Sequence, residues 1–318
     1  MKKELGISIL LFVLCAVTAI LNPRFVSPAN LFNLANSIGL FGVFSLGLGL
    51  VIITGGIDLS VGSVFALAGV LLAMALTEWH WPWPVAAAMA IAIPCVLGWA
   101  NGWLITRLKI QPFVVTLCGL LLYRGLARFI AGDGTKGFGN AEGFETLREL
   151  SKGKLLGLPM PFVILIVITI IMWFVLHRSI YGRYLFAVGR NEESTRFSGI
   201  NTRRVIASSY VVAGALTGIA GILLAFYTNS ISPSNHGSFY ELYGIAAAVL
   251  GGCSLRGGEG SIIGIIIGTA LFQVLQNVVN LLGIDSSLNF TVMGAVVLIG
   301  VLADQIVQKR SEKKLMRG

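Results

Sequence analysis

The sequence has few charged residues. Only 12% of its 318 residues are Asp, Glu, Lys or Arg, whereas 56% are hydrophobic. A soluble domain carries about 25% charged and 45–50% apolar residues. The composition therefore excludes an ordinary soluble domain. Because apolar runs of helical length fill the chain, we expect an all-α, polytopic membrane protein.

The sequence also lacks the motifs of common catalytic and nucleotide-binding sites. It contains no G-x-x-x-x-G-K-[ST] phosphate loop, no H-E-x-x-H zinc motif and no G-x-S-x-G nucleophile motif. The three histidines are far apart in the chain, and none of the four cysteines forms a C-x-x-C pair. We therefore expect no catalytic site, no metal site and no cofactor, and we expect any ATP hydrolysis to occur on another chain.

Ten apolar runs follow one another along the chain, and ionisable residues are scarce within them. This scarcity disfavours a carrier coupled to protons or Na⁺, which often holds such groups near the membrane midplane. Four-residue glycine spacings, at Gly214 and Gly218 and at Gly260, Gly264 and Gly268, predict close helix packing. The runs are Leu5–Leu21, Leu31–Ile53, Val61–Leu76, Val85–Ile105, Phe113–Ala131, Phe162–Leu176, Val205–Tyr227, Tyr243–Gly252, Ile262–Leu282 and Phe290–Ala303. The eighth and tenth are short for a complete crossing.

The chain has a net charge of +9, and its basic residues lie between and after the apolar runs rather than on one soluble face. In a membrane protein this pattern sets the orientation, so it does not indicate nucleic-acid binding. Ten crossings that start in the cytosol place most Lys and Arg residues inside, together with both termini. The long loop 132–161 is then external, and the long loop 177–204 is cytosolic.

A glycine-rich stretch with one acid, Thr54 to Ser63, separates the second and third runs. Gly55 and Gly56 allow the first helix to stop, and Asp58 and Ser60 can cap the N–H groups that start the next. A broken helix at membrane depth is tolerated where it faces protein or a water-lined cavity. The stretch is therefore either a surface loop with a capping Asp or part of a translocation path. Residues that could line such a path are Gly55, Gly56, Asp58, Ser60, Asn101, Asn277 and Asn280.

The loop 177–204 contains a predicted short amphipathic helix from Asn191 to Ile200. Asn191 can cap its start, the two following glutamates favour the N-terminal dipole, and Gly199 can end it. The helix could lie on the membrane surface, but glutamates weaken binding to an anionic leaflet, which favours a protein partner. Residues that would make this contact are Asn191, Glu192, Glu193, Arg196, Phe197, Gly199 and Ile200.

Five motifs in order along the chain resemble the permease subunits of bacterial ABC importers for monosaccharides, the ribose-type group. The most specific motif is the stretch from Gly55 to Ser63, and the similarity covers nearly the whole chain. The other four are Asn101-Gly102, Pro112 to Leu117 with Arg124-Gly125, Ala187 to Glu193 with Ser198-Gly199-Ile200, and Leu250-Gly251-Gly252 with Gly257 to Ser261.

This resemblance implies a function and a set of partners. The chain would be a single permease domain, 1–318, with about ten helices and a type II importer-like fold in the bacterial inner membrane. It would pair with a second permease subunit, identical or different, and with a cytosolic ABC ATPase. A periplasmic or lipid-anchored binding protein would deliver a ribose-like sugar, and Asn191–Ile200 would be the helix that couples to the ATPase. A branched-chain amino-acid ABC permease is the alternative within this fold, and a stand-alone secondary carrier is the alternative of another class.

Overall fold

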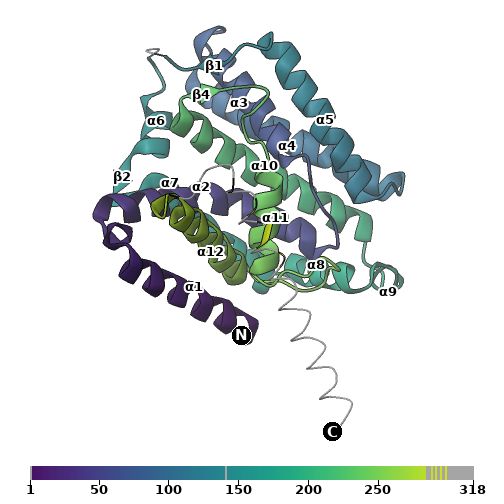
Figure 1. Cartoon of the computed structure of the whole chain (residues 1–318). Coiled ribbons are helices and arrows are strands. Elements are labelled where there is room, and N and C mark those ends of the chain that lie inside the picture. Colours follow the sequence, from purple (N-terminus) through teal and green to yellow (C-terminus); the bar gives the residue numbers. More distant parts are fainter. Residues whose placement is uncertain are drawn as a thin grey trace.

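The computed structural model describes residues 2–139 and 142–283, together with positions 288, 291, 294, 295 and 298. The tenth predicted run and the C-terminal basic residues therefore lie outside the described residues, apart from these isolated positions. The described part is a bundle of helices with two very short pairs of strands (Figure 1).

Seven helices of the described part are long and apolar enough to cross a membrane. They are α1 (Lys2–Leu21), α2 (Pro28–Ile53), α4 (Trp83–Arg107), α5 (Pro112–Ala131), α7 (Met160–His177), α10 (Thr202–Thr228) and α12 (Ile262–Leu281). Two shorter apolar helices are α3 (Val61–Thr77) and α11 (Tyr240–Leu250). The first nine predicted apolar runs thus each correspond to a helix, while the total of ten crossings stays a prediction.

The centre of the bundle is α2, most of which is buried, and α10 packs against both α2 and α4. The predicted close packing at the spaced glycines is confirmed. A side chain on Gly214 would overlap the Pro94 carbonyl of α4, and one on Gly268 would overlap the Ala247 carbonyl of α11. In contrast, α1 lies on the outside of the bundle along α12 (Figure 1).

The two ends of the bundle differ in structure. At one end, which we call the β1–β4 end, β1 (Lys136–Gly137) pairs with β4 (Ser230–Ile231) near α6 (Glu145–Lys152). The loop 132–161 also holds the antiparallel pair β2 (Lys154–Leu155) and β3 (Leu158–Pro159). At the opposite end, the α9 end, lie α8 (Ile180–Arg190) and α9 (Glu192–Phe197). A 3-10 turn, η1 (Pro23–Val26), joins α1 to α2.

The eighth predicted run is not a simple span. Its helix, α11, has 11 residues and begins at Tyr240. It is preceded by a non-helical segment, residues 232–239, that lies against α3. The hydrogen bond from His236 N to Ser232 O (2.8 Å) turns this segment, and a side chain on Gly62 of α3 would overlap the Gly237 carbonyl. We call residues 232–239 the interrupted segment.

Candidate functional site

The chain between α2 and α3 is non-helical from Thr54 to Ser60, and we call this stretch the broken segment. Gly55 has φ +81, in the left-handed region. Gly55 N donates to Ile52 O (2.9 Å) and Gly56 N donates to Val51 O (3.0 Å). This is the Schellman pattern that ends a helix with a left-handed glycine. The predicted role of the glycines in stopping the first helix is therefore confirmed.

Asp58 is buried, and one oxygen of its carboxylate binds Ser60. Its Oδ1 accepts hydrogen bonds from Ser60 N (2.9 Å) and from Ser60 Oγ (2.6 Å). The predicted acceptor role of Asp58 beside the start of α3 is confirmed. The predicted side-chain cap by Ser60 is wrong, since Ser60 has helical backbone angles and its hydroxyl turns back to Asp58.

Two further helices join this contact. Asn101 Nδ2 of α4 donates to Ser60 Oγ (3.1 Å), and the Tyr123 hydroxyl of α5 donates to Asn101 Oδ1 (3.0 Å). The Tyr210 hydroxyl of α10 donates to Ile57 O (3.2 Å). Buried polar groups stabilise a fold when their hydrogen bonds are satisfied. These contacts therefore clamp the broken segment against three helices.

A cavity of about 830 Å³ lies between the broken segment and α9. Gly55 and Gly56 line one side, and Glu193 and Arg196 line the other. Asp58, Ser60 and Asn101 do not line it, because they point into the protein interior. The lining consists of Thr54, Gly55, Gly56, Ile105, Thr106, Lys109, Ile110, Gln111, Pro112, Glu192, Glu193, Arg196, Gly199, Ile200, Asn201, Thr202, Arg203, Ile206 and Tyr210.

The helix α9 has the predicted start and stop signals but is shorter than predicted. Asn191 Oδ1 accepts from Ser194 N (2.8 Å), which confirms the N-cap. The helix ends at Phe197 rather than Ile200, because Gly199 adopts φ +83 and Ile200 N closes the turn on Thr195 O (3.4 Å). This second Schellman ending turns the chain into α10.

One end of α9 is tied to the bundle and the other is exposed. Thr202 Oγ1 of α10 donates to Glu192 Oε1 (3.0 Å), whereas the Phe197 side chain is 79% exposed. The preceding helix α8 was not predicted, although its signals are present in the sequence. Ser179 Oγ accepts from Gly182 N (3.1 Å), and Leu185 and Val188 form its buried face.

The structure separates two predicted path residues from the broken segment. Asn277 Nδ2 donates to Asn30 Oδ1 (2.7 Å), near the start of α2, and Asn280 is exposed. Asn30 lies about 35 Å along α2 from Ile53, at 1.5 Å per residue. Asn277 and Asn280 therefore lie toward the end of α2 opposite Asp58, and their predicted place in the translocation path stays a prediction.

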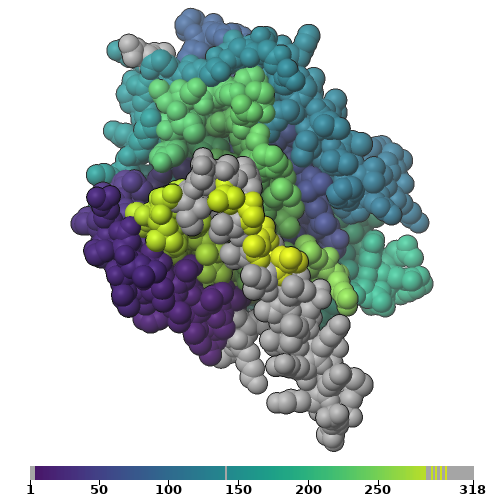
Figure 2. All heavy atoms as spheres, viewed as in Figure 1, coloured from purple at the N-terminus to yellow at the C-terminus, as the bar shows by residue number. Residues whose placement is uncertain are grey.

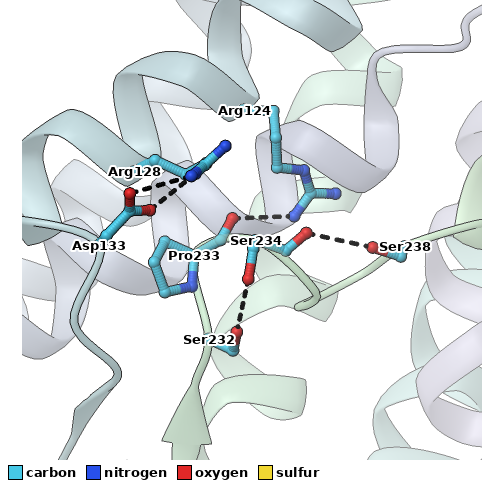
Figure 3. A network of polar contacts seen from close by, with 7 residues as sticks. All are labelled: Arg124, Arg128, Asp133, Ser232, Pro233, Ser234 and Ser238. Atoms are coloured by element: carbon cyan, nitrogen blue, oxygen red, sulfur yellow. Dashed lines mark hydrogen bonds and ion pairs between the residues drawn. The ribbon is translucent and has the colours of Figure 1, made fainter.

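Arg124 of α5 makes contacts that the sequence did not indicate (Figure 3). Its Nη1 donates to Pro233 O of the interrupted segment (3.2 Å), as Figure 3 shows. It also donates to His236 O of the same segment (2.7 Å). Within that segment, Ser232 Oγ lies 3.1 Å from Ser234 Oγ, and Ser238 Oγ donates to Ser234 O (3.4 Å). The available signal was the presence of Arg124 in the middle of an apolar run.

One turn further along α5, Arg128 forms an exposed ion pair with Asp133 (2.6 Å). The hydrogen bond from Arg128 lowers the pKa of the Asp133 carboxyl. Both side chains are more than half exposed, so this pair contributes little to stability.

Acidic, histidine and cysteine side chains do not gather into a group of three or more that could hold a metal ion within the described ranges.

Comparison with known proteins identifies relatives along nearly the whole chain. Residues 30–302 match the family model described as branched-chain amino acid transport system / permease component. The ribose import permease of Bacillus subtilis is 39% identical over 95% of this chain and 93% of its own length. The ribose import permease of Escherichia coli K12 is 37% identical over 93% of this chain and 92% of its own. The L-arabinose permease of Azospirillum brasilense is 31% identical over 98% and 90%. No solved structure matches significantly.

Proposed function

The chain belongs to this family of transport-system permease components, and from that premise we propose that it passes a monosaccharide across the bacterial inner membrane. It is a multi-pass membrane protein and the permease of an ATP-driven importer, and it is not an enzyme. Hydrolysis of ATP takes place on a separate ATPase, and a sugar-binding protein delivers the substrate.

The substrate class follows from the relatives rather than from the family description. The family description refers to branched-chain amino acids, which keeps a hydrophobic amino acid as the second candidate. Relatives that span almost the entire chain are named for ribose, fructose and arabinose. Ribose, fructose and arabinose are all neutral polyhydroxylated compounds. Among the relatives reported above, a ribose import permease has the highest identity to this chain, 39%. We therefore assign a pentose of the ribose type.

The proposed mechanism rests on the cavity between the broken segment and α9. This cavity joins the broken segment to α9, so a movement of α9 changes the walls of the space beside Gly55 and Gly56. We assign α9 as the helix that docks in a cleft of the ATPase. The exposed Phe197 ring provides its apolar contact, and the Glu192–Thr202 hydrogen bond passes its displacement to α10 as a rigid body.

We also propose the orientation and assembly. The α9 end and both termini face the cytosol, the β1–β4 end faces outward, and the tenth run completes ten crossings of one domain, 1–318. A second permease subunit, identical or different, completes the translocation pathway. Gly55 and Gly56 border this pathway at its cytosolic end, while Asp58, Ser60 and Asn101 hold the broken segment in place.

Reconstituted transport tests the assignment. The permease is placed in proteoliposomes with its partner ATPase and binding protein, and uptake of radiolabelled ribose, fructose, arabinose and leucine is measured. We expect uptake of ribose that requires ATP and the binding protein. Uptake of leucine alone would establish the second candidate, and ribose uptake without the ATPase would establish a secondary carrier.

A further inference from the structure

The interrupted segment lies at membrane depth. A methyl group on Gly69 of α3 would lie 3.4 Å from Ile231, and one on Gly62 would overlap the Gly237 carbonyl. Gly69 and Gly62 are about 12 Å and 22 Å from Thr77, the end of α3 that faces β1 and β4, at a rise of 1.5 Å per residue. The hydrocarbon core is about 30 Å thick. Residues 231–237 therefore descend well into the core alongside α3.

Irregular backbone at this depth is tolerated only where it is buried in protein or faces water. The inward side of the segment meets the first condition. Pro233 and His236 are buried, and Arg124 donates to the carbonyl oxygens of both. Glu241 of α11 is also buried, and its carboxylate touches Gly62 at the start of α3. The segment is thus fixed from behind by α5, α3 and α11.

The outward side of the segment is polar and open. Ser234 and Asn235 are exposed, and Ser232 and Ser238 are half-exposed beside them. The Phe239 ring next to them is 50% exposed. The neighbouring surface of α5, in contrast, presents Leu121 and Leu122 at 67% and 60% exposure. Exposed hydroxyl and amide groups at a depth where lipid offers them no hydrogen bonds require water or a polar solute in front of them.

One residue of the segment is held in an unfavourable backbone conformation. Phe239 has φ +68. A large side chain is rarely found in the left-handed region, and such residues cluster at functional sites where the surrounding structure holds them. Here the hydrogen bonds from Arg124 to the segment and from Tyr243 N to Phe239 O (3.2 Å) supply that hold, and the result is a half-exposed aromatic ring beside two exposed polar side chains.

We propose that Ser234, Asn235 and Phe239 form a contact surface for the transported solute inside the water-filled passage. The proposal rests on the assigned function of sugar import. Hydroxyl and amide groups donate and accept hydrogen bonds with sugar hydroxyls, and an aromatic ring packs against apolar C–H groups. Residues 232–239 contain no Asp, Glu, Lys or Arg, which matches a neutral polyhydroxylated solute. The broken segment holds the cytosolic end of the pathway, and this surface contacts the solute before it arrives there.

Water access is tested by cysteine labelling in the assembled importer. The four native cysteines are replaced by alanine, and Ser234→Cys and Asn235→Cys are compared with Ile170→Cys. Ile170 of α7 is 64% exposed and lies about 15 Å along α7 from Met160, so it is a lipid-facing control at similar depth. We expect a charged methanethiosulfonate reagent to modify both segment positions at least about tenfold faster than the control, because charged reagents do not enter lipid. Equal rates at all three positions would overturn the proposal.

Contact with the solute is tested by uptake and ATPase activity in the same complex. Asn235→Leu and Phe239→Leu should each lower ribose uptake by about fivefold or more, since a lost polar or aromatic contact of ~1 kcal/mol changes a rate by that order. Stimulation of the ATPase by the ribose-loaded binding protein should stay within about twofold, because neither residue touches α9. Unchanged uptake in both variants, or a parallel loss of stimulation, would overturn the proposed contact.

The controls separate this proposal from the assigned function. Ile170→Cys should transport at the rate of the cysteine-free protein. If the cysteine-free importer takes up no monosaccharide at all, the assigned substrate class fails, and the labelling contrast still decides whether the segment faces water. If ribose uptake is normal and the segment is no more accessible than Ile170, the assigned function stands and the inference fails.

Discussion

Asp58 illustrates how a single buried acid holds an irregular piece of backbone. Its carboxylate accepts both the N–H and the O–H of Ser60. We expect Asp58→Asn to keep part of the transport, since the amide oxygen can still accept both bonds, although without the negative charge that strengthens them. Asp58→Leu leaves a buried N–H without a partner, at a cost of about 1–3 kcal/mol, and should abolish transport or assembly. The measurement is the initial uptake rate per amount of assembled complex, and equal rates for Asp58→Leu and wild type would contradict this role.

A second prediction at the residue scale compares Arg124 and Arg128 of α5. Arg124 donates to two carbonyl oxygens of the interrupted segment, whereas Arg128 forms an exposed ion pair. Arg124→Met removes the donor to two carbonyl oxygens at membrane depth and should lower the midpoint of thermal unfolding of the purified complex by several degrees, for a loss of about 1–3 kcal/mol. Arg128→Met, the matched control, breaks only an exposed ion pair worth about 0–1 kcal/mol and should be close to wild type. Similar midpoints for the two variants would show that the Arg124 contacts do not stabilise the fold.

The residue scale also shows where sequence reasoning succeeded and where it failed. Local signals, such as a left-handed glycine at Gly55 or a capping Asn191, depend on the nearest few residues and were predicted correctly. The contacts of the Ser60 hydroxyl with Asn101 and of Asn277 with Asn30 were not predicted, because these partners are 41 and 247 residues away in the chain. No local pattern specifies such contacts.

At the scale of elements, α9 should respond to changes at its stop signal. Gly199 has φ +83, and a β-carbon there costs roughly 1 kcal/mol. We expect Gly199→Leu to lower transport and binding-protein-stimulated ATPase activity together, while Gly199→Asn retains most of both, because Asn tolerates the left-handed region. The readouts are uptake and ATPase activity of the same preparation. Normal values for Gly199→Leu would mean that α9 is not the coupling element.

The charged face of α9 gives a separate test. Glu193 lines the cavity and lies in the first turn of α9. Glu193→Ala should reduce ATPase stimulation by a few-fold, because it removes a charge from the proposed docking helix and from its N-terminal dipole. Glu149→Ala, on α6 near the β1–β4 end, is the control and should behave as wild type. The reverse pattern would assign the docking surface to the other end of the bundle.

Elements were predicted where hydrophobicity persists over a helical length. The first nine runs correspond to apolar helices, since twenty consecutive apolar residues have few other stable arrangements in a membrane protein. The helix α8 and the interrupted segment were missed. Residues 232–239 are polar and lack a helical period, so only their packing against Gly62 and Gly69 shows that they lie beside α3, from which we infer their depth in the membrane.

At the scale of the whole molecule, orientation is the central prediction. In a background without native cysteines, Gly134→Cys should react with an impermeant maleimide in intact cells, whereas Phe197→Cys should react only after the membrane is opened. Phe197 is chosen as the internal probe because it is exposed. Thr202, in the same region of the chain, is buried and bonded to Glu192, so a cysteine there would be a poor target for the reagent. Labelling of Phe197→Cys in intact cells would overturn the ten-crossing arrangement.

The packing of α1 on α12, visible as purple atoms beside yellow ones in Figure 2, has a consequence for biosynthesis. Asn22 Nδ2 donates to Leu281 O, a contact between residues 259 positions apart. At about 5–20 residues per second, the ribosome finishes α1 some 13–50 s before the last turn of α12. Until then α1 must stay inserted in the membrane without α12. Packing of α1 against α12 is therefore a late step of biogenesis. In a nascent chain that stops before α12, the Asn22 side chain has no Leu281 carbonyl to bind.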